Sequence, residues 1–278
     1  MAKLTYTNEK GQSLTFGDSA PLLVTKIDGL GSPQNEIYRQ KSPYQDGTTV
    51  THTALDEREL VLEGVILASA QDRQKYRQVL LQTFNPKLKG TLVFERYGTK
   101  KQIECIPELA PSFPSNMQEN YQQFLITLLC PNPFWLDDYT VSEEIVTWIG
   151  GMRFPWRLPS RFAMKGPKVI NIVNRGDVET PVRIEFRGPA TNPRVTNRAT
   201  GEFIQVNREL LAGDVLIITT DFGAKRVEIN GQNVFNWIDL ESSFWQLQIG
   251  DNVIEYSSDG PVEPASVSIS YRNRYVGV

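Results

Sequence analysis

The side chains that most often catalyse reactions or bind metals are scarce in this chain of 278 residues. His52 is its only histidine, and Cys105 and Cys130 are its only cysteines. A Ser-His or Cys-His catalytic pair would have to be built on His52, which lies in a threonine-rich run without a nucleophile turn. A zinc site needs several such ligands at short spacings. We expect no metal and no cofactor, and cysteines that are small buried groups, with a bridge or a reactive thiol as the alternatives.

Two other kinds of catalytic site also find little support. Phosphate-binding loops need a glycine-rich turn between a strand and a helix, and residues 67–70, which precede the one predicted helix, contain no glycine. Three carboxylate pairs, Asp137 with Asp138, Glu143 with Glu144, and Glu57 with Glu59, could serve a glycosidase only if two carboxylates faced each other across a cleft. Neighbouring acidic residues of this kind are common on solvated surfaces. The sequence therefore predicts a protein that is not an enzyme.

The composition is that of an ordinary folded protein. Apolar residues make up 40% and charged residues 22% of the chain, as in globular domains. The longest apolar stretch, residues 124–130, is far shorter than the roughly 20 residues that cross a bilayer, and the N-terminus turns polar too early for a secretory signal. The net charge of −3, with dispersed basic residues, argues against a nucleic-acid-binding face. We expect synthesis in the cytoplasm and no membrane insertion.

One helix and many strands are predicted. Ser69 can cap a helix, and apolar residues then recur at helical spacing as far as Phe84, before Asn85-Pro86 stops the pattern. This predicts a helix over about residues 69–85. Elsewhere the side chains alternate with period two, which is typical of antiparallel strands. In the first half we expect strands at residues 22–27, 59–67, 91–96, 102–106 and 121–129.

The second half alternates more cleanly. Residues 182–187 and 266–271 place apolar side chains on one face and polar side chains on the other, and Asn230-Gly231 suits a two-residue hairpin turn. About eight short strands without a helical period predict a β-sandwich. Between the halves the strand pattern is interrupted by a stretch rich in proline and glycine. We therefore expect two domains: residues 1–138, a β domain with one helix, and residues 139–278, a sandwich that includes a connector at 150–168.

Two sets of apolar side chains look exposed. The polar, turn-rich stretch 34–56 carries Ile37, Tyr38 and Tyr44 as isolated apolar groups, which makes sense if another chain covers them. We expect this stretch to form an arm that clasps a neighbouring subunit, with an ordinary surface loop as the alternative. Trp237 follows the predicted hairpin and is a candidate for stacking against a sugar ring.

The order of these elements resembles that of a known family. The motifs that carry the resemblance are, in order, Phe84-Asn85-Pro86, Pro131-Asn132-Pro133-Phe134-Trp135, Gly150-Gly151, Phe154-Pro155, Leu158-Pro159, Asn174-Arg175-Gly176-Asp177, Asn230-Gly231, Gly250-Asp251-Asn252 and a last Ser-Val-Ser-Ile-Ser-Tyr strand. Each motif is weak alone. Their order and spacing, over essentially the whole chain, are similar to those of the distal tail protein family of long-tailed bacteriophages.

That resemblance implies a structural protein that forms a hexameric ring at the tip of the phage tail. The N-terminal domains would form the ring, next to the tail tube protein, and galectin-like C-terminal sandwiches would dock receptor-binding or baseplate proteins. A tail-associated fibre or lysin protein would lie below, and DNA would pass through the channel without specific binding. The alternative is an adhesin that binds carbohydrate of the bacterial wall through the sandwich. Galectins grip sugar with a histidine, and the second half has none.

Overall fold

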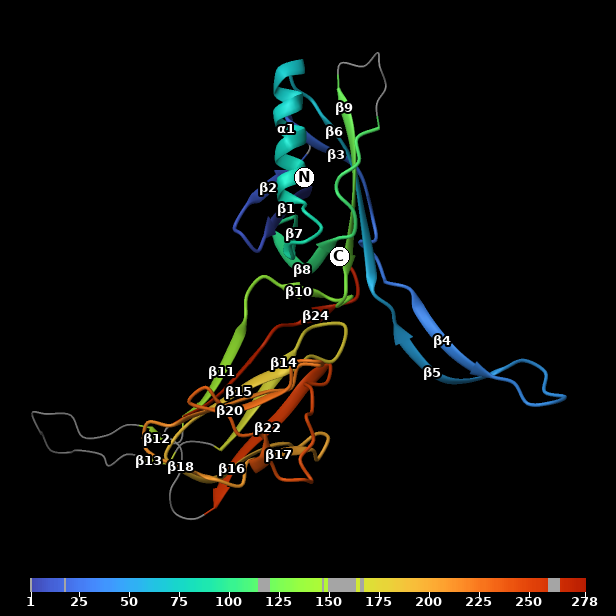
Figure 1. Cartoon of the computed structure of the whole chain (residues 1–278). Helices are drawn as coiled ribbons and strands as arrows, with labels where there is room; N and C mark the ends of the chain where they lie inside the picture. Colours follow the sequence, from blue (N-terminus) through green and yellow to red (C-terminus); the bar gives the residue numbers. More distant parts are fainter. Residues whose placement is uncertain are drawn as a thin grey trace, which may run out of the picture. The chain divides into compact units, whose positions relative to one another are not determined.

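The structure is a computed structural model that describes residues 2–17, 19–114, 121–146, 148–149, 164–165, 168–259 and 266–278. It is mainly β, with one α-helix in these ranges. The chain divides into two units, Met1–Asp138 with Tyr275–Val278 and Tyr139–Arg274 (Figure 1). The predicted connector at 150–168 lies outside the described residues, except for residues 164–165 and 168.

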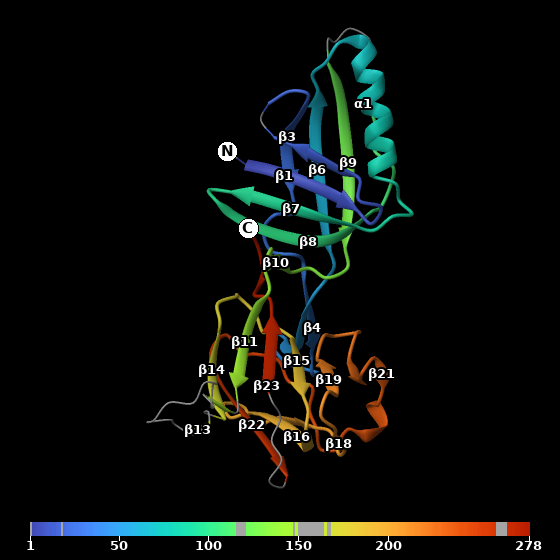
Figure 2. The same ribbon diagram turned by 90° about the vertical axis from the view of Figure 1, so that its left-hand side faces the viewer.

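The first unit is built on one curved antiparallel sheet. The strands of this unit are β1 (Ala2–Asn8), β2 (Ser13–Phe16), β3 (Leu22–Asp28), β4 (Asn35–Gln40), β5 (Thr49–Leu55), β6 (Arg58–Ile66), β7 (Gly90–Arg96), β8 (Thr99–Pro107), β9 (Gln122–Cys130), β10 (Trp135–Asp137) and β24 (Arg274–Tyr275). Of these, β4 and β5 lie outside the curved sheet and pair with each other. Hydrogen bonds run in the order β2-β1-β7-β8-β9-β6-β3, and a bridge between Gly17 and Leu23 links its two ends. The sheet thus closes towards a barrel. In Figure 2, β1, β7 and β8 cross β6 and β9 steeply.

The helix and the strands of this unit follow the predicted pattern. Helix α1 (Ala70–Thr83) begins after Ser69, whose hydroxyl accepts a hydrogen bond from the Asp72 amide at 3.2 Å. Phe84 ends the helix, and its ring stacks on Tyr6 with centroids 4.1 Å apart. Strands β3, β6, β7, β8 and β9 cover the five predicted strands. Strands β1 and β2 are not among the predicted strands, although Leu4 and Tyr6 of β1 and Leu14 and Phe16 of β2 alternate with polar residues.

The second unit consists of two antiparallel sheets and short additional pairs. Its strands are β11 (Val141–Val146), β12 (Trp148–Ile149), β13 (Met164–Lys165), β14 (Val169–Asn174), β15 (Val182–Arg187), β16 (Ala190–Asn197), β17 (Phe203–Gln205), β18 (Glu209–Leu210), β19 (Val215–Thr219), β20 (Arg226–Ile229), β21 (Gln232–Asn233), β22 (Gly250–Asp259) and β23 (Ser266–Tyr271), with a 3₁₀ turn η1 (Phe235–Trp237). One sheet has the order β11-β23-β15-β19-β20-β21, and the other β14-β22-β16-β17. This is the predicted sandwich.

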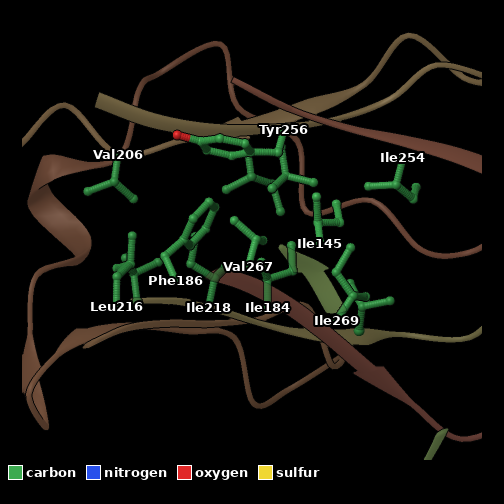
Figure 3. Packing of buried hydrophobic residues seen from close by; sticks show 14 of the residues in the cluster. Ile145, Ile184, Phe186, Val206, Leu216, Ile218, Ile254, Tyr256, Val267 and Ile269 are labelled. Atoms are coloured by element: carbon green, nitrogen blue, oxygen red, sulfur yellow. The ribbon is translucent and has the colours of Figure 1, made fainter. Parts of the chain in front are cut away.

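The core of the second unit lies between the two sheets (Figure 3). Phe186 of β15 meets Tyr256 of β22 edge to face, with ring centroids 6.1 Å apart. The predicted hairpin turn is confirmed, because Asn230 and Gly231 both have positive φ, 50° and 79°, between β20 and β21. The galectin-like character of this sandwich stays a prediction.

The end of the chain departs from the predicted domain limits. The predicted second domain extends to residue 278, whereas Tyr275–Val278, here called the return segment, pack with the first unit. Strand β24 pairs with β10, and the Tyr275 hydroxyl donates to a carboxylate oxygen of Asp137 at 3.3 Å. Lys101 binds the other oxygen of that carboxylate at 2.5 Å. The segment is too short to show any period, so no local pattern could assign it.

Candidate functional site

Strands β4 and β5 form a hairpin separate from the barrel strands. Within the described residues they pair only with each other, with Ile37 opposite Thr53, Tyr38 opposite His52, and a bulge after Tyr38. Every residue of β4 is exposed, and Figure 1 shows the hairpin extending away from the barrel. We call residues 34–56 the arm. An isolated two-stranded hairpin is only marginally stable in water, so a partner that covered the arm would stabilise it.

The arm presents apolar side chains on both of its faces. Directly opposed residues share a face, so Tyr38 lies with His52, and their rings are 5.9 Å apart. The Tyr38 hydroxyl donates to the Glu36 carboxylate at 2.8 Å, and this hydrogen bond holds the pKa of Tyr38 above its ordinary value. Ile37 points to the other face. The side chain of Tyr38 is 46% exposed and that of Ile37 is 43% exposed.

The tip of the arm adds a third exposed aromatic ring. Tyr44 is fully solvent-accessible, and its φ of 64° lies in the left-handed region that few non-glycine residues adopt. The structure thus places the three predicted arm residues on one element. Val50 of β5 is also exposed, at 55%. It was not singled out from the sequence, because its neighbours are polar and read as a solvated strand.

The arm joins the barrel at a root built around Arg58, whose side chain is 1% exposed. Its Nε donates to the carbonyl of Pro133 at 2.7 Å, and Nη2 donates to that of Val276 at 2.5 Å. Nη1 donates to the carbonyl of Gly29 at 2.5 Å and also to that of Gly31. Burial lowers the pKa of this guanidinium, because the charged form loses hydration. Four carbonyl dipoles take the place of the lost water.

The residues considered for catalysis do not come together. His52 lies exposed on the arm, and Asp137 is paired with Lys101 in the barrel. Cys105 and Cys130 are free and buried, as expected, and a hydrogen bond between them, together with burial, raises the pKa of Cys105. In the part of the chain that the structure describes, no three His, Cys, Asp or Glu side chains are grouped to hold a metal.

A hollow of 620 Å³ lies along β6 and β9. Its lining is Thr25, Glu63, Gly64, Val65, Leu67, Pro114, Tyr121, Gln123, Phe124 and Leu125. The Glu63 carboxylate is 3.5 Å from the Lys26 ammonium. In this lining the Thr25 hydroxyl donates to the backbone carbonyl of Glu63 at 3.1 Å, and not to a side-chain base.

The predicted sugar-stacking residue lies at the end of η1. Trp237 is 43% exposed, and the Arg208 guanidinium lies over its ring, 5.0 Å from the centroid. Nearby, the Asn207 amide donates to the Asp239 carboxylate at 3.1 Å and accepts from Gln205 at 2.7 Å. Aromatic and planar polar groups are therefore adjacent here, but one face of the indole ring is already covered by Arg208.

Comparisons with known proteins bear on both units. A family described as a phage tail protein RIFT-related domain matches residues 9–130. A family described as the C-terminal domain of a siphovirus-type tail component matches residues 175–275. The chain belongs to the siphovirus distal tail protein family. Among curated protein sequences no match was found.

Solved structures of the same fold cover the full chain. The crystal structure of the phage SPP1 Dit protein, described as a paradigm of the hub adsorption apparatus in phages that infect Gram-positive bacteria, matches with a TM-score of 0.72 over 98% of each chain, at 15% identity. The baseplate of phage P2 in its activated conformation with Ca matches with a TM-score of 0.53 over 100% of each chain, at 11% identity. At such identities the likeness shows the fold, and the predicted mainly β fold of this family is confirmed.

Family and fold together identify a structural component of a phage tail or baseplate. The described residues include no helix that is both long enough and apolar enough to cross a lipid bilayer.

Proposed function

We propose that this chain is the ring-forming hub at the distal tip of a siphovirus tail. Six copies form the ring, in which the first units continue the tail tube and the second units dock receptor-binding or baseplate proteins. A tail-associated fibre or lysin protein completes the tip below. The observation that carries the proposal is the arm, a hairpin with exposed apolar side chains on a chain whose fold matches a hub protein over its full length.

The dimensions of the arm suit a clasp between subunits. Strand β4 has 6 residues, which extend about 20 Å at about 3.3 Å per residue. A contact in which the arm of one copy meets a different surface of the next copy is heterologous, and such contacts generate a closed ring when the rotation between copies closes. Burial of Ile37, Tyr38 and Tyr44 by the neighbour would supply apolar contact area, at about 25 cal/mol per Å².

The charge of the chain suits a passage for DNA. Net charge is −3, and a protein that binds DNA without reading it does so through clustered Lys and Arg that displace counterions. A ring of such chains lets DNA through without holding it. The assembled protein resides in the virion tail tip, after synthesis in the cytoplasm of the bacterial host.

Substitution of the arm tests the clasp. The double variant Ile37→Ser with Tyr44→Ser removes apolar contacts on the arm, and we expect ring assembly to weaken about tenfold or more, since about 1.4 kcal/mol corresponds to one decade. Sedimentation velocity and electron microscopy, with the tail tube protein present, measure the assembly. Thermal unfolding should not change, because neither side chain packs in the barrel core.

The matched control is Tyr97→Ser, which removes another exposed tyrosine, at the turn between β7 and β8. This variant should assemble like the unchanged protein. A wild-type chain that stays monomeric even with its tail partners contradicts the hub. A double variant that forms rings at the wild-type concentration contradicts the clasp and leaves the ring standing.

A second candidate function, a carbohydrate-binding adhesin, is favoured by the exposed indole of Trp237 beside planar polar side chains. Pull-down with bacterial cell-wall glycan tests it, with Trp237→Ala compared against Phe222→Ala, which removes another exposed aromatic ring of the second unit. Loss of binding in the first variant alone supports the adhesin. Equal binding by both removes the candidate site.

A further inference from the structure

Three chain segments that are remote in sequence meet at the root of the arm. Residues 29–31 lead into β4, Arg58 follows β5, and the return segment comes back after the whole second unit. The amide of Val278 donates to the carbonyl of Leu30 at 3.1 Å. Gly277 also lies against residues 30–31. The return segment therefore packs directly on the residues from which the arm departs.

Inside this root, Arg58 joins the segments to one another. Two of its acceptors, Gly29 and Gly31, belong to the entry into the arm, and a third, Val276, belongs to the return segment. A guanidinium can satisfy several carbonyls at once because its donors form a rigid planar fork, whereas a lysine ammonium is a point charge on a flexible stem. A hydrophobic residue could fill the volume, but it could not connect these carbonyls.

The arm beyond the root has little else to hold its direction. The amide of Asp56 donates to the carbonyl of Gln34 at 2.9 Å, which closes the hairpin at its base. That bond joins the two arm strands to each other and not to the barrel. Since β4 alone extends about 20 Å, a rotation of about 10° at the root would displace the far end of this strand by about 3.5 Å.

We propose that Arg58 is a positioning residue for the arm: by tying the return segment to residues 29–31, it sets the direction in which the arm leaves the barrel. The return segment acts as the second half of the same device, because it supplies one acceptor and covers the arm entry. The biological purpose of this positioning role rests on the proposed clasp between subunits. The direction of the arm itself is a property of the single chain.

Distance measurement between spin labels tests the proposal in the full chain. Labels are placed on the arm at Ser42→Cys and on the first unit at Lys87→Cys, both exposed positions, while the native cysteines are buried. A small fraction of labelled chain is diluted into unlabelled chain, so that only distances within one chain are read. Circular dichroism and thermal melting of each variant report whether the barrel is intact.

Three variants perturb the root, and one is a matched control. Arg58→Met removes all four hydrogen bonds, Arg58→Lys keeps the charge, and a third variant lacks Val276–Val278. We expect a narrow distance distribution in the unchanged protein, and a distribution about twofold broader or displaced for Arg58→Met and the shortened variant, as for a segment with few remaining contacts. Arg58→Lys should lie between. Arg96→Met, which removes a guanidinium stacked on exposed Tyr97, should match the unchanged protein.

The outcomes separate this proposal from the ring. A wild-type distribution in both Arg58→Lys and the shortened variant, with an intact barrel, overturns the positioning role, as does a broad distribution in the unchanged protein. If Arg58→Met does not fold, the distance distributions of Arg58→Lys and of the shortened variant decide whether Arg58 positions the arm. A broader distance distribution in the root variants, together with unchanged ring assembly, would contradict the clasp and leave the positioning role standing. A narrow arm distribution in an unchanged protein that forms no ring would contradict the ring and leave the positioning role standing.

Discussion

Strands β5 and β6 are separated by two residues, yet they lie in opposite environments. In β6, which runs between β3 and β9, Leu60 and Leu62 are fully buried. In β5, which pairs on one edge only, the first five residues are all exposed. Both strands have β-branched or apolar residues at alternate positions, so local preference does not separate them. The difference shows that the environment of a strand is decided by the elements on its two edges and faces.

The largest expected effect lies on β6. Leu62→Ala should lower the free energy of unfolding by about 2–5 kcal/mol, because it leaves a cavity in a packed core. Val50→Ala on β5, the matched change in the arm, should alter it by less than about 0.5 kcal/mol. Urea unfolding followed by circular dichroism measures both. Comparable losses for the two variants would mean that the arm is part of the folded core.

A second pair of variants compares the root of the arm with its tip. Gly29 and Gly47 both have positive φ, 88° and 78°, but a Cβ at Gly29 would lie 2.0 Å from the carbonyl oxygen of Glu59, while nothing surrounds Gly47. Gly47→Ala should cost about 1 kcal/mol of local strain at the tip and leave barrel unfolding unchanged. Gly29→Ala must also move the β6 backbone, so barrel unfolding should shift to lower urea. Equal urea midpoints for the two variants would contradict this account of the root.

The smallest effect concerns two tyrosines in alkali. Burial raises the pKa of Tyr6 in the barrel, so its contribution to stability is complete below its unfolded value of about 10 and is lost as the pH rises towards the folded value. Tyr6→Phe should therefore reduce the fall in the unfolding midpoint above about pH 10. Tyr38→Phe should do so much less, because its pKa is raised by a hydrogen bond to Glu36 on an exposed arm, where ionisation needs no unfolding of the barrel. Urea midpoints at several alkaline pH values compare the two, and identical pH profiles would refute the contrast.

The features that the sequence predicts well are local ones. Helix α1 could be placed because Ser69 and Asn85-Pro86 mark its ends within a few residues of the apolar stripe. The arm could be proposed because Ile37, Tyr38 and Tyr44 stand isolated in a polar stretch, which no barrel strand resembles. Its partner surface stays a prediction, because a single chain does not contain it.

The root of the arm could not be predicted, for a physical reason. Arg58 stands at the start of an alternating strand, where an arginine normally reaches solvent. Its acceptor Val276 is 218 positions away in sequence, and residues 276–278 form no periodic pattern. Only the closure of the barrel brings the carbonyls of Gly29 and Val276 to the same guanidinium. A buried cation whose acceptors are all backbone carbonyls leaves no complementary charge in the sequence to signal it.

The return segment also sets an order of events during synthesis. Domains generally fold as units as they emerge from the ribosome, but Tyr275–Val278 belong to the first unit and are made after the second. Until they emerge, Arg58 lacks the Val276 carbonyl and the arm entry lacks its cover. A nascent chain thus holds an arm without a set direction until both units are complete.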